Sequence, residues 1–243
     1  MENSVVILAG GLGTRLGKLT KNLPKSMISV NQKPFFYHQL NLLESKGVKN
    51  IHFCLGHYSD ILKKSIMNSI FYNKLNVTFS FDGEKLLGTG GAIKNAFQFI
   101  TDEFFVMYGD SYLDVDLKMI NSFYKMNKKN GDGLMTIFKN NKKYDTSNVV
   151  YKNNYVSNYS KKKIVDEMNY IDYGIGILTK EHFLTYDNNP FDLSILYEKL
   201  SKKSRLIGYE VKNRFYEVGS IDDIKNLSKY LIKNKLWITQ TNI

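Results

Sequence analysis

The stretch VVILAGGLGTRLGKLTKNLPKSM, residues 5–27, decides the fold class of this chain. Residues 4–9 predict a buried strand, because a short, continuous apolar run before glycines suits a strand that is covered on both faces. Glycines, an arginine and spaced lysines follow directly. A cationic, glycine-rich loop at the end of a first buried strand indicates an anion site at the carboxyl edge of an α/β sheet.

Short apolar runs alternate with helical patterns through the rest of the first half. In the first helix, Phe36, Leu40 and Leu43 recur at i, i+4 and i+7, and Gly47 ends it. This β-α-β-α-β-α-β order predicts an α/β fold with a doubly wound, mainly parallel, Rossmann-like mixed sheet flanked by helices. The predicted elements are strands at 4–9, 51–55, 77–81 and 104–108, and helices at 34–46, 59–71 and 89–99.

The second half is less regular. Ser220 and Asp223 form a capping-box pattern at the start of a last helix, whose apolar face begins at Ile224. No repeat or low-complexity tract separates two parts, so we expect one domain over residues 1–243. Strands are predicted at 134–138, 148–151, 155–159, 170–178, 205–210 and 214–218, with a hairpin around the sequence KNN at 152–154.

Composition limits the partners and the compartment. The 243 residues carry 34 Lys and Arg against 23 Asp and Glu, a formal charge of +11, which favours anionic partners without choosing among them. Cys54 is the only cysteine, which suits a reducing compartment. No signal-peptide pattern is visible, and no apolar run approaches the ~20 residues of a membrane span. We therefore expect a cytoplasmic protein without membrane insertion.

The glycine loop matches neither of two common phosphate-binding motifs. The Rossmann fingerprint G-x-G-x-x-G requires glycine where this chain has Leu16, and the acid expected at the end of the second strand is absent, since FCLGHY at 53–58 contains none. The P-loop pattern G-x-x-x-x-G-K-[ST] fails at Leu12 and again at Leu19. A dinucleotide site and a P-loop are both excluded by these substitutions.

What remains is GGLGTRL followed by Pro24-Lys25. Glycines let backbone N–H groups approach a polyphosphate, an arginine offers two parallel hydrogen bonds, and a lysine adds a second positive charge. Two further segments, 87–91 and 109–110, also follow predicted strands. Because ligands bind beyond the carboxyl ends of strands in such sheets, we expect all three segments to meet at one edge.

These motifs resemble the sugar-1-phosphate nucleotidyltransferase family. The similarity runs from Val5 to about Tyr230 and includes LGTGGAI at 87–93 and YGDS at 108–111. Within the family, the motif LGTGGAI and the length of this chain resemble those of the short bacterial enzymes that act on D-glycero-α-D-manno-heptose 1-phosphate with GTP. The resemblance implies the nucleotide-diphospho-sugar transferase type of fold.

The resemblance also implies the reaction. A sugar 1-phosphate would attack the α-phosphorus of a nucleoside triphosphate (NTP), giving an NDP-sugar for surface glycan synthesis and releasing pyrophosphate. Such a protein aligns two anions and stabilises charge on the leaving group, so its site needs glycines, cations and metal-binding acids. The first half, about residues 1–115, would bind the nucleotide, and residues 116–243 would bind the sugar.

By resemblance, Arg15 neutralises the leaving pyrophosphate and Lys25 acts on the α-phosphate side. Asp82 and Glu84 both suit the position that reads the base, which leaves the base open. The nucleotide-binding residues implied by the resemblance are Leu8, Ala9, Gly10, Gly11, Gly13, Thr14, Asp82, Gly88, Thr89 and Gly90.

Two acids are implied as Mg²⁺ ligands. Asp110 lies in YGDS, and Glu217 lies in FYEVGS, where the family has an aspartate. Mg²⁺ takes one or two carboxylates together with substrate phosphates. Taken alone, each acid also has a simpler interpretation. A Gly-Asp pair is common in turns, and a glutamate at a strand end is often only solvated.

The sugar side is less well defined. Ser160 stands where the family has an acid, and Lys162 competes with Lys161 for the lysine that follows. The acceptor therefore stays open. The residues implied on the sugar-phosphate side are Tyr108, Gly109, Lys161, Asp172 and Gly174.

Other functions stay open beside the leading one. They are a cytidylyltransferase for another sugar or polyol phosphate, and a non-catalytic sugar-nucleotide binder. A nucleic-acid binder rests on charge alone, since no recognisable module interleaves aromatic and basic residues, and we expect none. A tryptophan near the chain end, Trp237, is expected to pack against either the last helix or a neighbouring subunit, so a homo-oligomer also stays open.

Overall fold

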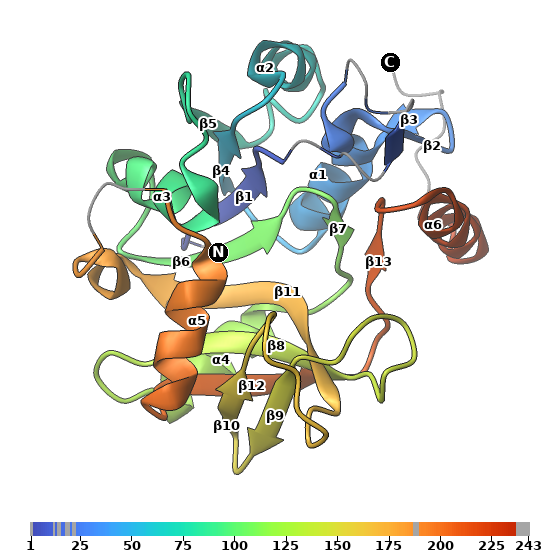
Figure 1. Cartoon of the computed structure of the whole chain (residues 1–243). Coiled ribbons are helices and arrows are strands. Elements are labelled where there is room, and N and C mark those ends of the chain that lie inside the picture. Colours follow the sequence, from blue (N-terminus) through green and yellow to red (C-terminus); the bar gives the residue numbers. More distant parts are fainter. Residues whose placement is uncertain are drawn as a thin grey trace.

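One mixed sheet runs through the computed structural model, which describes residues 2–11, 13, 16, 17, 20, 23–186 and 190–236 (Figure 1). Its strands are β1 (Val5–Ala9), β4 (Asn50–Leu55), β5 (Asn76–Phe81), β6 (Glu103–Tyr108), β8 (Gly133–Lys139), β9 (Val149–Lys152), β10 (Tyr155–Tyr159), β11 (Tyr170–Thr179) and β12 (Leu206–Val211). Their order is β5-β4-β1-β6-β11-β8-β12-β10-β9. Strands from both halves of the chain therefore share one sheet.

The strand directions confirm the predicted fold class. β5, β4, β1 and β6 are parallel throughout, with Ile7 of β1 level with Phe53 and Met107. β11 runs antiparallel to both β6 and β8, whereas β8 and β12 are parallel. Following the pairings across the sheet, only β10 and β11 oppose the direction of the other strands. The sheet is mixed, and its strands point mainly one way.

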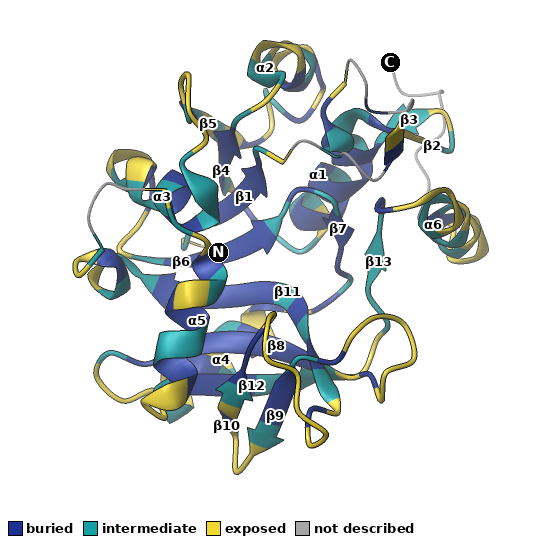
Figure 2. Ribbon diagram, in the orientation of Figure 1, coloured by how far each residue is buried: buried dark blue, intermediate teal, exposed yellow. Residues whose placement is uncertain are grey.

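Alternate residues of β1 separate two layers of helices. Ile7 packs in one cluster with α1, α2 and α4, whereas Val6 and Leu8 pack in another with α3 and α5. Burial on both faces explains why β1 is apolar at every position. Figure 2 shows this buried sheet between helices whose outer faces are exposed. The helices are α1 (Phe35–Ser45), α2 (Ser59–Met67), α3 (Gly88–Asn95), α4 (Leu117–Asn127), α5 (Leu193–Lys202) and α6 (Ile221–Lys233).

α6 packs outside the first layer. Leu227 and Leu231 join a third cluster with Phe35 and Leu42 of α1. α6 is the longest helix in the described ranges, at 13 residues. None of the helices in those ranges has the length and apolar character needed to cross a bilayer.

The predicted hairpin turn and the end of the first helix are confirmed, whereas α2 and α3 end at Met67 and Asn95, before the predicted positions 71 and 99. Asn153 and Asn154 have φ angles of 51° and 63° and close the β9–β10 hairpin, as asparagines do in such turns. Gly47, at φ 77°, follows α1. Ser220 caps α6 by accepting a hydrogen bond from the Asp223 N–H, but its hydroxyl donates to the Asp223 carboxylate at 2.7 Å. Only one half of the predicted capping box is therefore present.

α4 and α5 have no counterpart among the predicted elements. Both begin at an aspartate N-cap, Asp116 and Asp192. α4 also exposes Met119 and Met126. Apolar residues on the solvent face make the 3.6-residue hydrophobic period of a helix harder to recognise in the sequence. Two short antiparallel pairs complete the fold: β2 (Ser29–Val30) with β3 (Lys33–Pro34), and β7 (Ser111–Tyr112) with β13 (Tyr216–Glu217).

Gly176→Ala is expected to destabilise the fold. An added Cβ would lie 2.1 Å from the Tyr197 hydroxyl oxygen and 2.9 Å from the Leu134 carbonyl oxygen. Such overpacking costs about 1–3 kcal/mol of unfolding free energy, which urea denaturation measures. Gly11→Ala is the control, because no atom of the described chain lies within 4 Å of its added Cβ. Equal stability of wild type and Gly176→Ala would contradict this packing.

Candidate active site

A buried glutamine holds the turn that presents Asp110. β6 ends at Tyr108, two residues before this acid. From α1, Gln39 Nε2 donates hydrogen bonds to the backbone oxygens of Tyr108 and Ser111, each at 3.0 Å. Gln39 is fully buried. Its amide bridges the residues on both sides of Asp110 and so fixes the turn at the carboxyl end of β6.

Lys25 and Asp110 form an ion pair at this edge. Lys25 Nζ lies 2.5 Å from Asp110 Oδ2, and both side chains are partly exposed. The short 3₁₀ helix Lys25–Met27 carries the lysine, and Ser26 Oγ within it donates to the Gly109 carbonyl oxygen at 2.8 Å. Two residues far apart in the sequence thus meet as predicted. Arg15, the second predicted cation, lies outside the described residues.

Glu217 lies beside Asp110 because β13 pairs with β7. Glu217 is opposite Ser111 in the register, and the Val218 N–H donates to the Asp110 carbonyl oxygen at 3.0 Å. Burial and then the charge of Asp110 raise the pKa of Glu217 to about 7, although Lys25 acts in the opposite direction. Two neighbouring carboxylates therefore share an environment that favours a cation.

The donor set fits a Mg²⁺ ion whose coordination is completed by substrate. Among the described residues, no group of three or more His, Cys, Asp or Glu side chains is placed to hold a metal ion. Mg²⁺ keeps several waters and takes one or two carboxylates plus phosphate oxygens, so Asp110 and Glu217 suffice as the protein's share. Burial is the main cause of the raised Glu217 pKa, and a divalent cation held by these acids would offset the second cause, the charge of Asp110.

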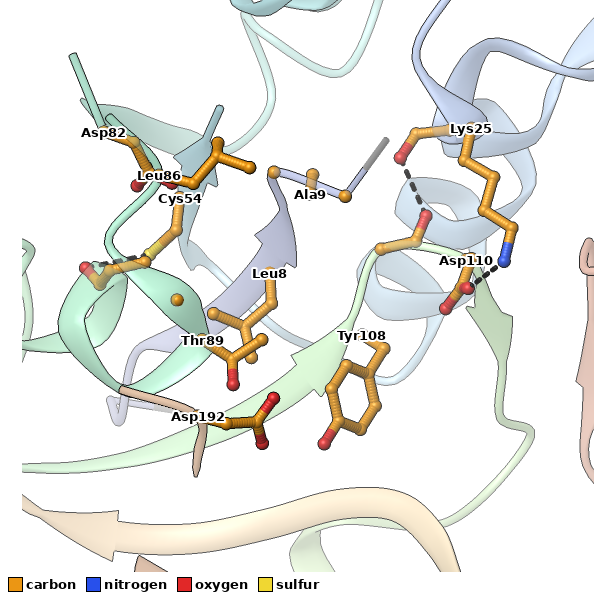
Figure 3. A pocket seen from close by; sticks show the side chains of 16 residues that line it. Leu8, Ala9, Lys25, Cys54, Asp82, Leu86, Thr89, Tyr108, Asp110 and Asp192 are labelled. Atoms are coloured by element: carbon orange, nitrogen blue, oxygen red, sulfur yellow. Dashed lines mark hydrogen bonds and ion pairs between the residues drawn. The ribbon is translucent and has the colours of Figure 1, made fainter. Parts of the chain in front are cut away.

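A first pocket opens beyond the carboxyl ends of β1 and β6 (Figure 3). Figure 3 shows Asp82 and Leu86 on one side of it and Lys25 with Asp110 on the other. The pocket brings together most of the residues predicted to bind nucleotide. Its lining is Leu8, Ala9, Gly10, Gly11, Lys25, Ser26, Cys54, Asp82, Leu86, Gly88, Thr89, Ala92, Tyr108, Gly109, Asp110 and Asp192.

A second pocket adjoins the first. Lys25, Tyr108 and Asp110 line both, so these residues form a shared wall. The second pocket also collects four of the five residues predicted on the sugar side, whereas the fifth, Gly109, lines the first pocket instead. Its lining is Lys25, Tyr108, Asp110, Ser111, Asp145, Thr146, Asn148, Lys161, Ile164, Ile171, Asp172, Tyr173, Gly174 and Glu217.

Of the three consecutive lysines at 161–163, Lys161 is the one that lines the second pocket. Its Nζ lies 5.5 Å from the centroid of the Tyr108 ring. The backbone N–H groups of Lys162 and Lys163 donate to Ser160 Oγ at 3.2 and 3.0 Å, which closes a turn. Lys162 and Lys163 are not among the lining residues. The ambiguity between Lys161 and Lys162 thus disappears in the folded chain.

Asp172 and Gly174 line the same pocket from β11. Burial raises the pKa of Asp172, while the charge of Lys161 and the Gly174 N–H, at 3.0 Å, act in the opposite direction. Gly174 has φ 105°, a backbone conformation that residues with a side chain rarely adopt. The glycine therefore allows the bend that brings the Asp172 carboxylate toward Lys161.

Gly90 and Gly13, two of the residues predicted to bind the nucleotide, line neither pocket. The Gly90 N–H donates to the Phe191 carbonyl oxygen at 2.9 Å, and an added Cβ would lie 2.1 Å from the Phe191 ring. The first turn of α3 is thus capped by protein, and Gly90 packs against a ring instead of lining either pocket. The Gly13 carbonyl accepts a hydrogen bond from Thr20 Oγ1 at 2.8 Å. Thr14 lies outside the described residues.

Sequence reasoning missed that the second half closes the first pocket. The Phe191 N–H donates to the Leu87 carbonyl at 3.0 Å, and the Leu193 N–H donates to Thr89 Oγ1 at 2.7 Å. We call residues 191–193 the strap. It carries Asp192 into the pocket wall. An aspartate before an apolar run does signal a helix cap, but no local pattern signals contact with residues 87–90.

The chain matches the family model described as nucleotidyl transferase over residues 4–231. It belongs to the nucleotidyl transferase family. Because the match spans most of the chain, both pockets lie within the family's domain.

Relatives of similar length agree with this membership of the nucleotidyl transferase family. D-glycero-alpha-D-manno-heptose 1-phosphate guanylyltransferase of Campylobacter jejuni is 27% identical over 230 residues, which cover 94% of this chain and 99% of the relative. The enzyme of the same name from Aneurinibacillus thermoaerophilus is 28% identical, with 93% and 97% covered. The crystal structure of HddC from Yersinia pseudotuberculosis complexed with GMP-PN gives a TM-score of 0.79 at 28% identity, over 94% of this chain and 99% of that one.

The reaction class expected from the sequence is therefore confirmed. As a nucleotidyltransferase of this family, the chain transfers a nucleotidyl group from an NTP to a sugar 1-phosphate, giving an NDP-sugar and pyrophosphate. The nucleotide-diphospho-sugar transferase type of fold is confirmed as well.

Gln39→Met tests the support of Asp110. The substitution removes both hydrogen bonds to the turn, so kcat should fall roughly 10- to 100-fold, as expected when a reacting group is misplaced. Pyrophosphate release measures it. Ser45→Ala, on the same helix, removes a 2.7 Å hydrogen bond to the Leu42 carbonyl away from both pockets and should leave kcat unchanged. An unchanged kcat in Gln39→Met would show that the amide does not position the site.

Proposed function

We propose that the chain is a guanylyltransferase that joins GMP from GTP to a heptose 1-phosphate, releasing pyrophosphate and supplying surface glycan synthesis. The observation that carries this proposal is the pair of adjoining pockets with a shared wall of Lys25, Tyr108 and Asp110. Relatives that align over nearly their whole length are named heptose 1-phosphate guanylyltransferases, which supports the choice of both substrates.

In this proposal each pocket takes one substrate. The first half of the chain, about residues 1–115, binds the NTP through the backbone of Gly10 and Gly11, and residues 116–243 bind the sugar phosphate. The acceptor oxygen then reaches the α-phosphorus across the shared wall. Lys25 stabilises charge that grows there, and Arg15 stabilises the leaving pyrophosphate. Alignment of two anions across a shared cation supports in-line displacement without a protein nucleophile.

Asp82 is proposed to select guanine. The Watson–Crick edge of guanine offers two neighbouring N–H donors, which one carboxylate can accept. Asp82 lines the first pocket, and its Oδ2 accepts from the Leu87 N–H at 3.3 Å. Burial raises the pKa of Asp82, and that N–H partly offsets the shift, so further N–H donors would stabilise the ionised carboxylate. The alternative, Glu84, is exposed and absent from the lining.

Mg²⁺ is proposed as the cofactor, held by Asp110 and Glu217 together with substrate phosphates. When bound, it would neutralise phosphate charge and so allow the two anionic substrates to approach. Lys25 keeps the Asp110 carboxylate oriented at the shared wall. The chain's own contribution is thus to hold two carboxylates and one cation at the point where the pockets meet.

We infer a cytoplasmic location for this activity. Cys54 is the only cysteine, so no disulfide within the chain supports the fold. It is buried, and burial raises its pKa to about 12, which keeps it as an unreactive thiol. Both features suit a reducing compartment.

A substrate grid tests the function. Purified protein is incubated with Mg²⁺, each of the four NTPs and a panel of hexose and heptose 1-phosphates, and pyrophosphate release is measured. GTP with a heptose 1-phosphate should give the highest kcat/KM. Higher turnover with CTP, or with an ordinary hexose 1-phosphate, would replace the proposed substrates. Absence of turnover with every pair would overturn the function.

Asp110→Asn tests the metal role. Loss of one ligand charge should lower Mg²⁺-dependent kcat by at least roughly 100-fold, while circular dichroism shows an unchanged fold. Asp114→Asn is the matched control, because Asp114 also pairs with a lysine, Lys46 at 2.7 Å, but lines neither pocket. A near-normal rate for Asp110→Asn, or an equal loss in both variants, would count against Asp110 as a ligand.

A further inference from the structure

Asp192 brings a negative charge into a pocket that receives a triphosphate. It is exposed and lines the first pocket. Its Oδ1 accepts a hydrogen bond from the Ser194 N–H at 2.8 Å and caps α5. Asparagine or serine caps a helix about as well. The charge is favoured by the helix dipole but is not required for the cap, and it repels the phosphates of the nucleotide.

The strap fixes the position of this carboxylate. On one side of Asp192, the Phe191 carbonyl accepts from the Gly90 N–H at 2.9 Å. On the other, the Leu193 N–H donates to Thr89 Oγ1 at 2.7 Å. Both partners belong to α3, whose first turn lies in the first half of the chain. The carboxylate is therefore held at the pocket wall by the backbone on either side of it, before any substrate binds.

Asp192 faces the junction of the two pockets. Figure 3 shows its carboxylate at the same end of the first pocket as Thr89 and the Tyr108 ring, and that ring also lines the second pocket. Burial tends to raise the pKa of Asp192, but hydrogen bonds from Ser194 and the charge of Lys161 outweigh it and lower the pKa. A hydrogen bond with the Thr89 side chain, in the first pocket, also lowers this pKa, and Lys161 lines the second pocket, so Asp192 interacts with residues of both pockets.

The junction also holds a polar group without a partner. Tyr108 Oη is buried, and no described residue forms a hydrogen bond with it. Burial raises the pKa of this hydroxyl, and the charges of Asp172 and Asp192 raise it further. Two carboxylates, a lysine and an unpaired phenol make a polar wall, and sugar hydroxyls are the groups that satisfy such a wall, since each both donates and accepts.

We propose that Asp192 is an acceptor-specificity residue, whose second carboxylate oxygen accepts a hydrogen bond from a ring hydroxyl of the sugar 1-phosphate. This inference rests on the proposed function and extends it to the selection of the acceptor. Ribose hydroxyls of the nucleotide offer the same chemistry. The acceptor is favoured because the Tyr108 ring, at the same end of the first pocket as Asp192, also lines the second pocket, and because Lys161, whose charge acts on Asp192, lines the second pocket.

Asp192→Asn isolates the charge, because asparagine keeps the cap of α5. Hydrogen bonds to charged groups are the stronger ones, so KM for the sugar 1-phosphate should rise roughly tenfold, while KM for GTP changes less than about twofold. Asp192→Ser, which also caps the helix, should show a similar or larger rise. Both constants are measured by pyrophosphate release.

Monodeoxy sugar 1-phosphates identify the hydroxyl. With the analogue that lacks it, wild type and Asp192→Asn should have equal KM values, whereas other deoxy analogues should keep the tenfold difference. Asp116→Asn is the matched control, because Asp116 caps α4 through the Lys118 and Met119 N–H groups and lines neither pocket. It should leave both KM values unchanged.

Four results would overturn the inference. A rise in KM for GTP that disappears with 2′-deoxy-GTP or 3′-deoxy-GTP would assign Asp192 to the ribose. Equal behaviour of Asp192→Asn and Asp116→Asn would leave it a helix cap only. A wild-type protein inactive with every substrate pair would refute the proposed function and this role together, whereas an active wild type with an unchanged Asp192→Asn KM would refute only the role of Asp192.

Discussion

The site depends on the carboxyl end of β6, because β6 is the strand at which the pairing of neighbouring strands changes from parallel to antiparallel. On one side β6 is parallel to β1, and on the other it is antiparallel to β11. The parallel side leaves the glycine loop after β1 at the same edge as Asp110. The antiparallel side brings in Asp172 and Gly174 of β11. Residues at the end of β6 therefore serve two pockets at once.

Charge balance keeps this shared wall in place without substrate. Lys25 pairs with Asp110, and Glu217 lies beside them in an environment that raises its pKa. The chain as a whole carries a formal charge of +11, but the wall holds one acid and one lysine, and a second acid, Glu217, lies beside it in the second pocket. A pre-set arrangement of this kind needs little reorganisation when phosphates arrive, which is how fixed charges stabilise developing charge most effectively.

The strap makes the first pocket a product of both halves of the chain. Phe191 covers the N–H groups at the start of α3, where an open helix end would otherwise attract an anion. In the proposed function, the nucleotide phosphates are therefore bound by the glycine loop and Lys25. The same contact places Asp192, from the second half of the chain, in the lining of the first pocket. Selection of the acceptor and shape of the nucleotide pocket thus depend on the same three residues.

The sequence by itself determined the elements whose patterns are local. The apolar run at β1, the helical stripe of Phe36, Leu40 and Leu43, and the asparagine turn of the β9–β10 hairpin all appear where periodicity and turn chemistry predicted them. The motif resemblance also named Lys25 and Asp110, which the fold joins in an ion pair. Local hydrogen bonding and the period of apolar side chains depend on residues that are close in the sequence, so they can be predicted without the tertiary structure.

Only the tertiary structure decided which of the named residues face a pocket. It turned Gly90 toward Phe191, brought Lys161 rather than Lys162 to Tyr108, and carried Asp192 across from the other half. These outcomes depend on the strand order and on contacts between residues about a hundred positions apart. No periodic pattern encodes such contacts, because packing between distant segments is settled by the shape and burial of the whole sheet.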